Sequence, residues 1–169
     1  MSDTLLQKAI DCLKIQDVFQ RSVSANITEG FDPKYLRENL QSQFKHIVTK
    51  SQVININDDN EDICLFHVYI DLGVRWMPAS LDLEEANDDE SNEPSIMAFI
   101  EATFVAEYSL DGEPGKEALD AFALKNASYH IWPYWREFLM SQCMRMNLPK
   151  ISLPAVQFAV NKDESSSED

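Results

Sequence analysis

Glycine is scarce in this sequence, with four residues in 169 and none in a Gly-x-Gly cluster. That scarcity argues against a phosphate-binding loop, and no zinc-ligand spacing or nucleophile motif is present either. No apolar run approaches the roughly 18 residues that a membrane helix needs, and the first residues lack the basic start and apolar run of a signal peptide. We therefore expect a cytoplasmic protein that is not an enzyme and uses no cofactor or metal.

Cysteine is also rare. Cys12, Cys64 and Cys143 are an odd number, widely spaced, with no Cys-x-x-Cys pair, and we expect buried free thiols in a reducing compartment. Cys64 and His67 lie three residues apart on an expected strand, so they point to opposite faces and cannot form one site. His46, His67 and His130 have no motif around them, and we interpret all three as ordinary packing residues.

Positive charge is the third shortage, because 14 Lys and Arg stand against 29 Asp and Glu, a net charge of −15. This surface would repel nucleic acid and anionic membranes. Seven acids fall between residues 82 and 93, and four more between 163 and 169. We expect one domain over residues 1–162, with a helix at 4–14 and an acidic loop at 78–94, followed by a disordered tail at 163–169.

Alternating apolar and polar residues predict four strands, at about residues 15–27, 44–57, 63–77 and 95–110. The pattern of the second strand breaks near residues 50–52, which indicates a bulge. The last two strands each have one fully apolar face, typical of an antiparallel pair on one core. In the first strand, one face is expected to carry the apolar residues Ile15, Phe19, Val23, Ala25 and Ile27.

Helical spacing predicts helices at residues 4–14 and 117–126, and a third whose first turn contains Pro133 and which ends at about residue 147. The order of one helix, four strands and further helices reads as an α+β fold. Glu101 and Glu107 share a strand face but lie about 20 Å apart, which is too far for paired-carboxylate chemistry. Asp71 is expected near Glu101 in the neighbouring strand.

The aromatic cluster at residues 129–135 is the most unusual composition in the chain. Packing into the core explains it most simply. Six methionines and three tryptophans also suit a surface that accepts varied apolar ligands, because methionine is flexible and polarisable. Composition alone favours the core but leaves both interpretations open.

Three blocks in this region resemble the SecB family of chaperones. They are Trp132-Pro-Tyr-Trp-Arg-Glu137, Met146-Asn-Leu-Pro149 and Leu153-Pro-Ala-Val-Gln-Phe158. Residues 98–110 are similar to that family's last strand, and residues 18–27 are more weakly similar to its first. The order and spacing of the blocks make the match more specific than any one of them, and together they span most of residues 15–158.

The resemblance implies a four-stranded antiparallel sheet with helices packed on one face, assembled as a homotetramer, a dimer of dimers. It implies an ATP-independent chaperone whose apolar grooves hold unfolded client polypeptides, a preprotein or an antitoxin. A non-chaperone adaptor that binds one folded partner is the alternative.

The chain departs from the family pattern in ways that bear on protein export. Export chaperones of this family bind the translocation motor through an acidic outer sheet face. Glu101 matches one of those acids, whereas Ser22 and Asn26 stand where two others are expected. We also expect the family's C-terminal helix to be missing, and the helix at 4–14 and the acidic loop to be additions to the family pattern. Binding to an export motor is therefore doubtful, and dedicated service to a toxin–antitoxin pair is slightly favoured.

Five apolar residues near strand or helix ends are the candidates for the client-binding groove: Trp76, Met77, Trp132, Trp135 and Phe158. We expect Trp135 to be the likeliest of them to belong to the core, because it lies on the apolar stripe of the last helix. Trp76, next to the acidic loop, is expected to be more open.

Overall fold

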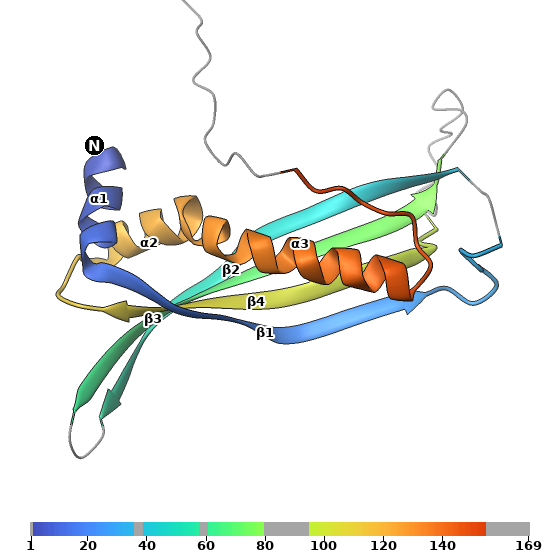
Figure 1. The fold of residues 1–169 in the computed structure, drawn as a ribbon. Coiled ribbons are helices and arrows are strands. Elements are labelled where there is room, and N and C mark those ends of the chain that lie inside the picture. The colour runs from blue at the N-terminus through green and yellow to red at the C-terminus, as the bar shows by residue number, and fades with distance from the viewer. Residues whose placement is uncertain (1, 36–38, 58–60, 80–94, 155–169) are drawn as a thin grey trace, which may run out of the picture.

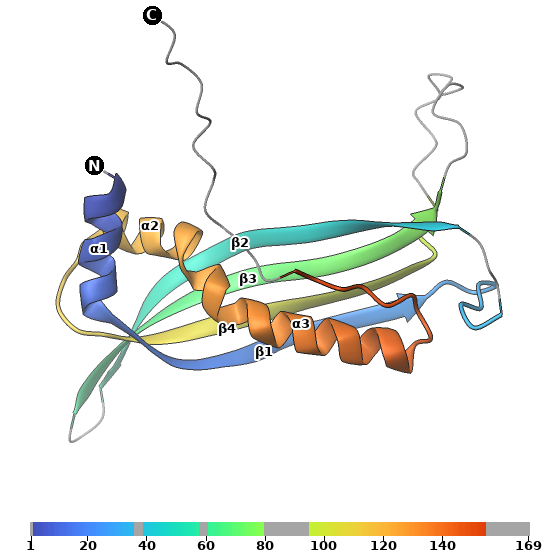
Figure 2. The ribbon, with the colours of Figure 1, turned by 45° about the horizontal axis from the view of Figure 1, so that its top comes forward.

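The computed structural model describes residues 2–35, 39–57, 61–79 and 95–154. Its elements are α1 (Ser2–Cys12), β1 (Leu13–Ile27), β2 (Leu40–Asn57), β3 (Asp62–Pro78), β4 (Ala98–Leu110), α2 (Lys116–Lys125) and α3 (Ala127–Arg145). The strands form one antiparallel sheet in the order β1-β4-β3-β2. The helices lie over one face of this sheet, with α1 packed against α2 at one end (Figures 1 and 2). The predicted α+β fold is confirmed.

The core lies between the helices and the inward faces of β3 and β4. As the alternation predicts, the even positions of both strands are buried from Phe66 to Trp76 and from Ala98 to Tyr108. Trp135 of α3 stands edge-on to Phe104, with ring centroids 6.4 Å apart, and Tyr108 meets Phe122 of α2 at 5.0 Å. Burial of these large side chains fixes the position of the helices on the sheet.

The first strand differs from its prediction because it contains two register shifts, between Ile15 and Asp17 and between Gln20 and Ser22. Each shift inserts one residue and reverses the faces that follow. Phe19 consequently lies opposite Val105 on the outer face, whereas Ile15 and Val23 lie on the helix face. The apolar face predicted for this strand is confirmed for Ile15, Val23, Ala25 and Ile27 and is wrong for Phe19. The bulge predicted in β2 is present, between Val48 and Lys50, slightly earlier than expected.

The last helix also differs, since it begins at Ala127 and contains Pro133 in its interior. The Asn126 N–H donates to the Phe122 carbonyl at 2.8 Å and the Asn126 carbonyl accepts from the Tyr129 N–H at 3.1 Å, so α2 bends directly into α3. Pro133 cannot donate to the carbonyl four residues earlier, a cost that the packing of α3 against the sheet offsets. Placing Pro133 in the first turn was therefore wrong. The other helices begin and end within two residues of their predicted bounds.

The predictions for the acidic loop lie almost entirely outside the described residues, and those for the tail wholly outside them. All three cysteines are free thiols, but only Cys143 is buried, and Cys12 and Cys64 are partly exposed. None of the described helices has the length and apolar character needed to cross a membrane.

Candidate functional site

The first turns of α3 are attached to the sheet on two sides. Ser128 Oγ shares a hydrogen bond of 2.8 Å with His46 Nε2 of β2, and His130 Nδ1 shares one of 2.9 Å with the Tyr108 hydroxyl of β4. Burial lowers the pKa of both histidines and raises the pKa of Tyr108, because it penalises each charged form. Burial therefore favours the neutral form of both histidines.

Beyond α3 the chain reverses and runs back alongside the helix as an extended segment, residues 148–154, which we call the strap (Figure 1). Asn147 makes the reversal with a left-handed φ of 54°, and the Leu148 N–H donates to the Cys143 carbonyl at 2.9 Å, a helix ending of the kind asparagine allows. Leu148 and Leu153 are buried. The indole Nε1 of Trp132 donates to the Pro154 carbonyl at 3.1 Å, which fastens the far end of the strap to the start of α3.

An apolar hollow of about 230 Å³ lies between the end of α3 and the strap. Met140, Cys143 and Met144 line it from the helix, and Lys150, Ile151 and Ser152 from the strap. A wider hollow of about 490 Å³ continues it along α3 toward Pro133. Met140 and Met144 are 54% and 64% exposed, although both are large and apolar. We call this surface the methionine groove, and its flexible side chains can adapt to different apolar ligands.

The Cys143 thiol at the base of this groove is packed as a small apolar group. Burial raises its pKa, with the hydrogen bond from the Ile151 backbone acting in the opposite direction. A thiol that stays protonated is a poor nucleophile and a poor metal ligand. The thiol therefore offers apolar contact, as do Met140 and Met144. The wider hollow also contains three polar side chains, those of Arg136, Glu137 and Ser141.

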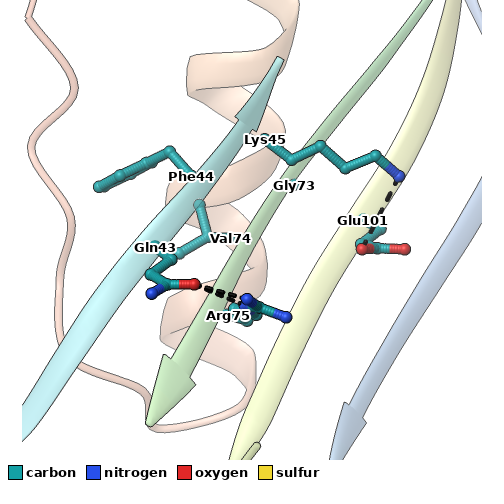
Figure 3. A pocket seen from close by; sticks show the side chains of 7 residues that line it. All are labelled: Gln43, Phe44, Lys45, Gly73, Val74, Arg75 and Glu101. Carbon is teal, nitrogen blue, oxygen red and sulfur yellow. Dashed lines mark hydrogen bonds and ion pairs between the residues drawn. The ribbon is translucent and has the colours of Figure 1, made fainter. Parts of the chain in front are cut away.

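A third hollow, of about 250 Å³, lies on the outer sheet face around Gly73 (Figure 3). The side chain of Glu101 crosses over Gly73, where an added Cβ would meet Glu101 Cγ at 3.0 Å. Lys45 Nζ lies 4.0 Å from Glu101 Oε1 and 3.7 Å from Asp71 Oδ2. The predicted proximity of Asp71 to Glu101 is confirmed, because one lysine contacts both. These are exposed pairs, and each contributes little stability.

No protein-family model matches this chain, and neither does any curated protein. Among solved structures, it is similar to the Rv1957 SecB-like chaperone of Mycobacterium tuberculosis, in complex with a ChAD peptide from the Rv1956 HigA1 antitoxin. The TM-score is 0.65 and the identity 18%, over 91% of this chain and 97% of the other. The chain has the SecB-like fold. The resemblance found in the sequence blocks is confirmed at the level of the fold.

Within the SecB-like fold, the five groove candidates occupy different positions. Trp135 is 1% exposed and belongs to the core, as expected. Trp76 is 2% exposed, so the expectation that it is open is wrong. Its side chain is the last one on the inward face of β3. The Trp76 carbonyl accepts a hydrogen bond of 2.8 Å from the Met97 N–H, which keeps the end of the strand in the sheet. Met77 is 1% exposed, and Phe158 lies outside the described residues.

Trp132 lines neither hollow of the methionine groove, but it is the candidate that contacts the strap, at Pro154. It is half-buried, and its ring meets the edge of His46 at a centroid separation of 6.5 Å. The sequence pattern did not single out the methionine groove, His46 or Lys45. Two signals were available: the six methionines of the chain, and the position of Met140 and Met144 outside the apolar stripe of the last helix.

The outer sheet face of the SecB-like fold carries the residues considered for docking. Ser22 pairs with Thr103 and Asn26 with Phe99, so both lie on the same face as Glu101. Two of the three positions are thus uncharged, and the third is next to a lysine.

Proposed function

We propose that this protein is an ATP-independent holding chaperone that binds unfolded client polypeptides and carries out no reaction of its own. The observation that supports this most directly is the methionine groove, an exposed apolar surface beside the strap, in a chain with the SecB-like fold. The similar chaperone from Mycobacterium tuberculosis was solved with an antitoxin peptide, and a peptide is the class of ligand that such a groove accommodates.

The physical basis of holding is burial of apolar surface. An unfolded chain exposes apolar side chains at intervals, and the groove offers Met140 and Met144 to cover them. Flexible thioethers adapt to different side chains, so binding does not require one sequence. Such binding needs no nucleotide, because transfer of apolar surface out of water is itself favourable.

We further propose that the protein is cytoplasmic and works as a homotetramer, a dimer of dimers. The support is apolar surface that a single chain leaves open on the helix face of β1, where Ile15 and Val23 are 44% and 49% exposed. Apolar patches of this kind are typical of interfaces between protein chains. Sedimentation at micromolar concentration should give a mass near four times 19.3 kDa.

The outer face favours service to a toxin–antitoxin pair over general export. Ser22 and Asn26 are neutral, and Lys45 offsets the charge of Glu101. A basic partner such as an export motor would therefore find little complementary charge on these three positions. Restoring the charges as Ser22→Asp with Asn26→Glu should strengthen motor binding at low salt, where surface charges are least screened. Tight motor binding by the unmodified protein would contradict the antitoxin preference.

Suppression of aggregation tests the chaperone function. We expect the wild-type protein to keep a chemically denatured reference protein in solution at stoichiometric ratios, without nucleotide. Met140→Ser with Met144→Ser should weaken this effect, while Leu124→Ser on α2, which removes a side chain of similar exposure, should not. A wild-type protein that suppresses nothing would overturn the proposal. Stable binding of one folded protein, without binding of unfolded chains, would favour the adaptor alternative.

A further inference from the structure

The strap has the conformation and the contacts of a bound extended peptide, although it belongs to the chain itself. Among the described residues, the backbone of residues 149–154 makes no backbone–backbone hydrogen bond. Two hydrogen bonds hold the strap, one from the Trp132 indole to the Pro154 carbonyl and one between the Ile151 backbone and the Cys143 thiol. The apolar side chains of Ile151 and Leu153 also pack on the core.

The sequence of the strap explains this arrangement. Ile151 and Leu153 are two residues apart, so in an extended chain both point to the same side and reach the core together. Pro149 and Pro154 at either end have no N–H and prevent the segment from joining a strand ladder. An unfolded client that placed apolar side chains at alternate positions could make the same contacts.

We propose that the strap is a resident occupant of the client groove, and that a bound client displaces it. This inference rests on the chaperone function proposed above and adds its regulation. Displacement would expose the apolar side of α3 at Cys143 and extend the methionine groove beneath the strap. In the absence of a client, the strap keeps that surface away from water and from other proteins.

Opening of the strap breaks no backbone ladder, because its middle is held by the side chains of Ile151 and Leu153 and by two hydrogen bonds. Segments with few buried contacts and no backbone ladder open at a small fraction of the free energy of global unfolding. A client must compete with the closed strap, so its apparent dissociation constant is the intrinsic constant divided by the fraction of open molecules. Loosening the strap should therefore tighten client binding.

Hydrogen exchange distinguishes an occupant from a fixed groove wall. The strap contains five exchangeable amides. That of Leu148 is bonded to the Cys143 carbonyl, and the four between the prolines, those of Lys150, Ile151, Ser152 and Leu153, are the ones to follow. The probe is α-lactalbumin that has been reduced and carboxyamidomethylated, which keeps it unfolded in native buffer. If the strap is displaced, saturating probe raises the exchange rates of these amides. If the strap is a fixed wall, the probe lowers them, and that result would overturn the inference.

Two variants test the same point by affinity. Trp132→Phe keeps an aromatic ring but removes the bond to the Pro154 carbonyl, and should tighten probe binding by about threefold to tenfold, the effect of one net hydrogen bond. Leu153→Ser removes an apolar anchor of the strap and should also tighten probe binding. If this variant fails to fold, the test rests on the milder Trp132→Phe. Weaker binding by a folded Trp132→Phe protein overturns the displacement mechanism but leaves the chaperone function standing. Absence of probe binding to the wild-type protein overturns both.

Discussion

Truncation of Trp76 should destabilise the protein as strongly as truncation of a central core residue. Its side chain is 2% exposed, and that of Trp135 is 1% exposed. A buried tryptophan removes about 150–250 Å² from water, which at about 25 cal/mol/Å² corresponds to about 4–6 kcal/mol. Measured losses for buried aromatic residues are about 3–5 kcal/mol, because the surroundings partly collapse. We expect Trp76→Ala and Trp135→Ala to fall in that range.

Trp132→Ala is the matched control, since this tryptophan is half-buried. Its loss should cost about 1–2 kcal/mol, from one hydrogen bond and part of the apolar surface. Urea unfolding followed by circular dichroism gives the free energies, measured at two protein concentrations because assembly makes stability depend on concentration. A loss below about 1 kcal/mol for Trp76→Ala would show that this position is not in the core, and would restore it as a groove candidate.

Three further predictions concern other parts of the chain. Gly73→Ala should displace the Glu101 side chain and cost about 1 kcal/mol of stability, and Glu101→Ala in the same protein should remove most of that loss in a double-mutant cycle. Because burial lowers the pKa values of His46 and His130, the unfolded chain takes up protons first as pH falls below their ordinary 6.5. Stability should thus decrease from pH 7 toward pH 5.5, and His46→Gln with His130→Gln should flatten that decrease. Deletion of residues 163–169 should leave the melting temperature and client holding unchanged, because a charged segment without apolar residues buries little.

The sheet could be predicted where each strand follows a strict two-residue period. In β3 and β4 the inward positions are apolar from Phe66 to Trp76 and from Ala98 to Tyr108, and no register shift interrupts their pairing. The pattern therefore gives the buried face directly. In β1 the same reasoning fails at Phe19, because two inserted residues reverse the faces and nothing in the local sequence marks both positions.

The helices show a similar limit. The position of Pro133 suggested a helix start, since proline is favoured in a first turn and costly in an interior. In the structure the helix nevertheless begins six residues before Pro133. Contacts with the sheet stabilise that first part, because Ser128 is hydrogen-bonded to His46 and His130 to Tyr108. These contacts join segments more than 20 residues apart, so a local pattern could not indicate them.

The groove illustrates why a family resemblance predicts a fold more readily than a site. The matching blocks contain prolines, tryptophans and apolar residues that determine how α3 ends and how the strap returns along it. Trp76 and Trp135 are large and apolar for the same reason that a client anchor would be, so composition cannot separate core from surface. The exposure of each side chain distinguishes core from surface: Met140 and Met144 are exposed, whereas Trp76 and Trp135 are buried. Because the strap covers part of the same helix, the surface available to a client depends on whether this segment is closed. The exchange behaviour of the four amides between Pro149 and Pro154 is therefore the decisive measurement.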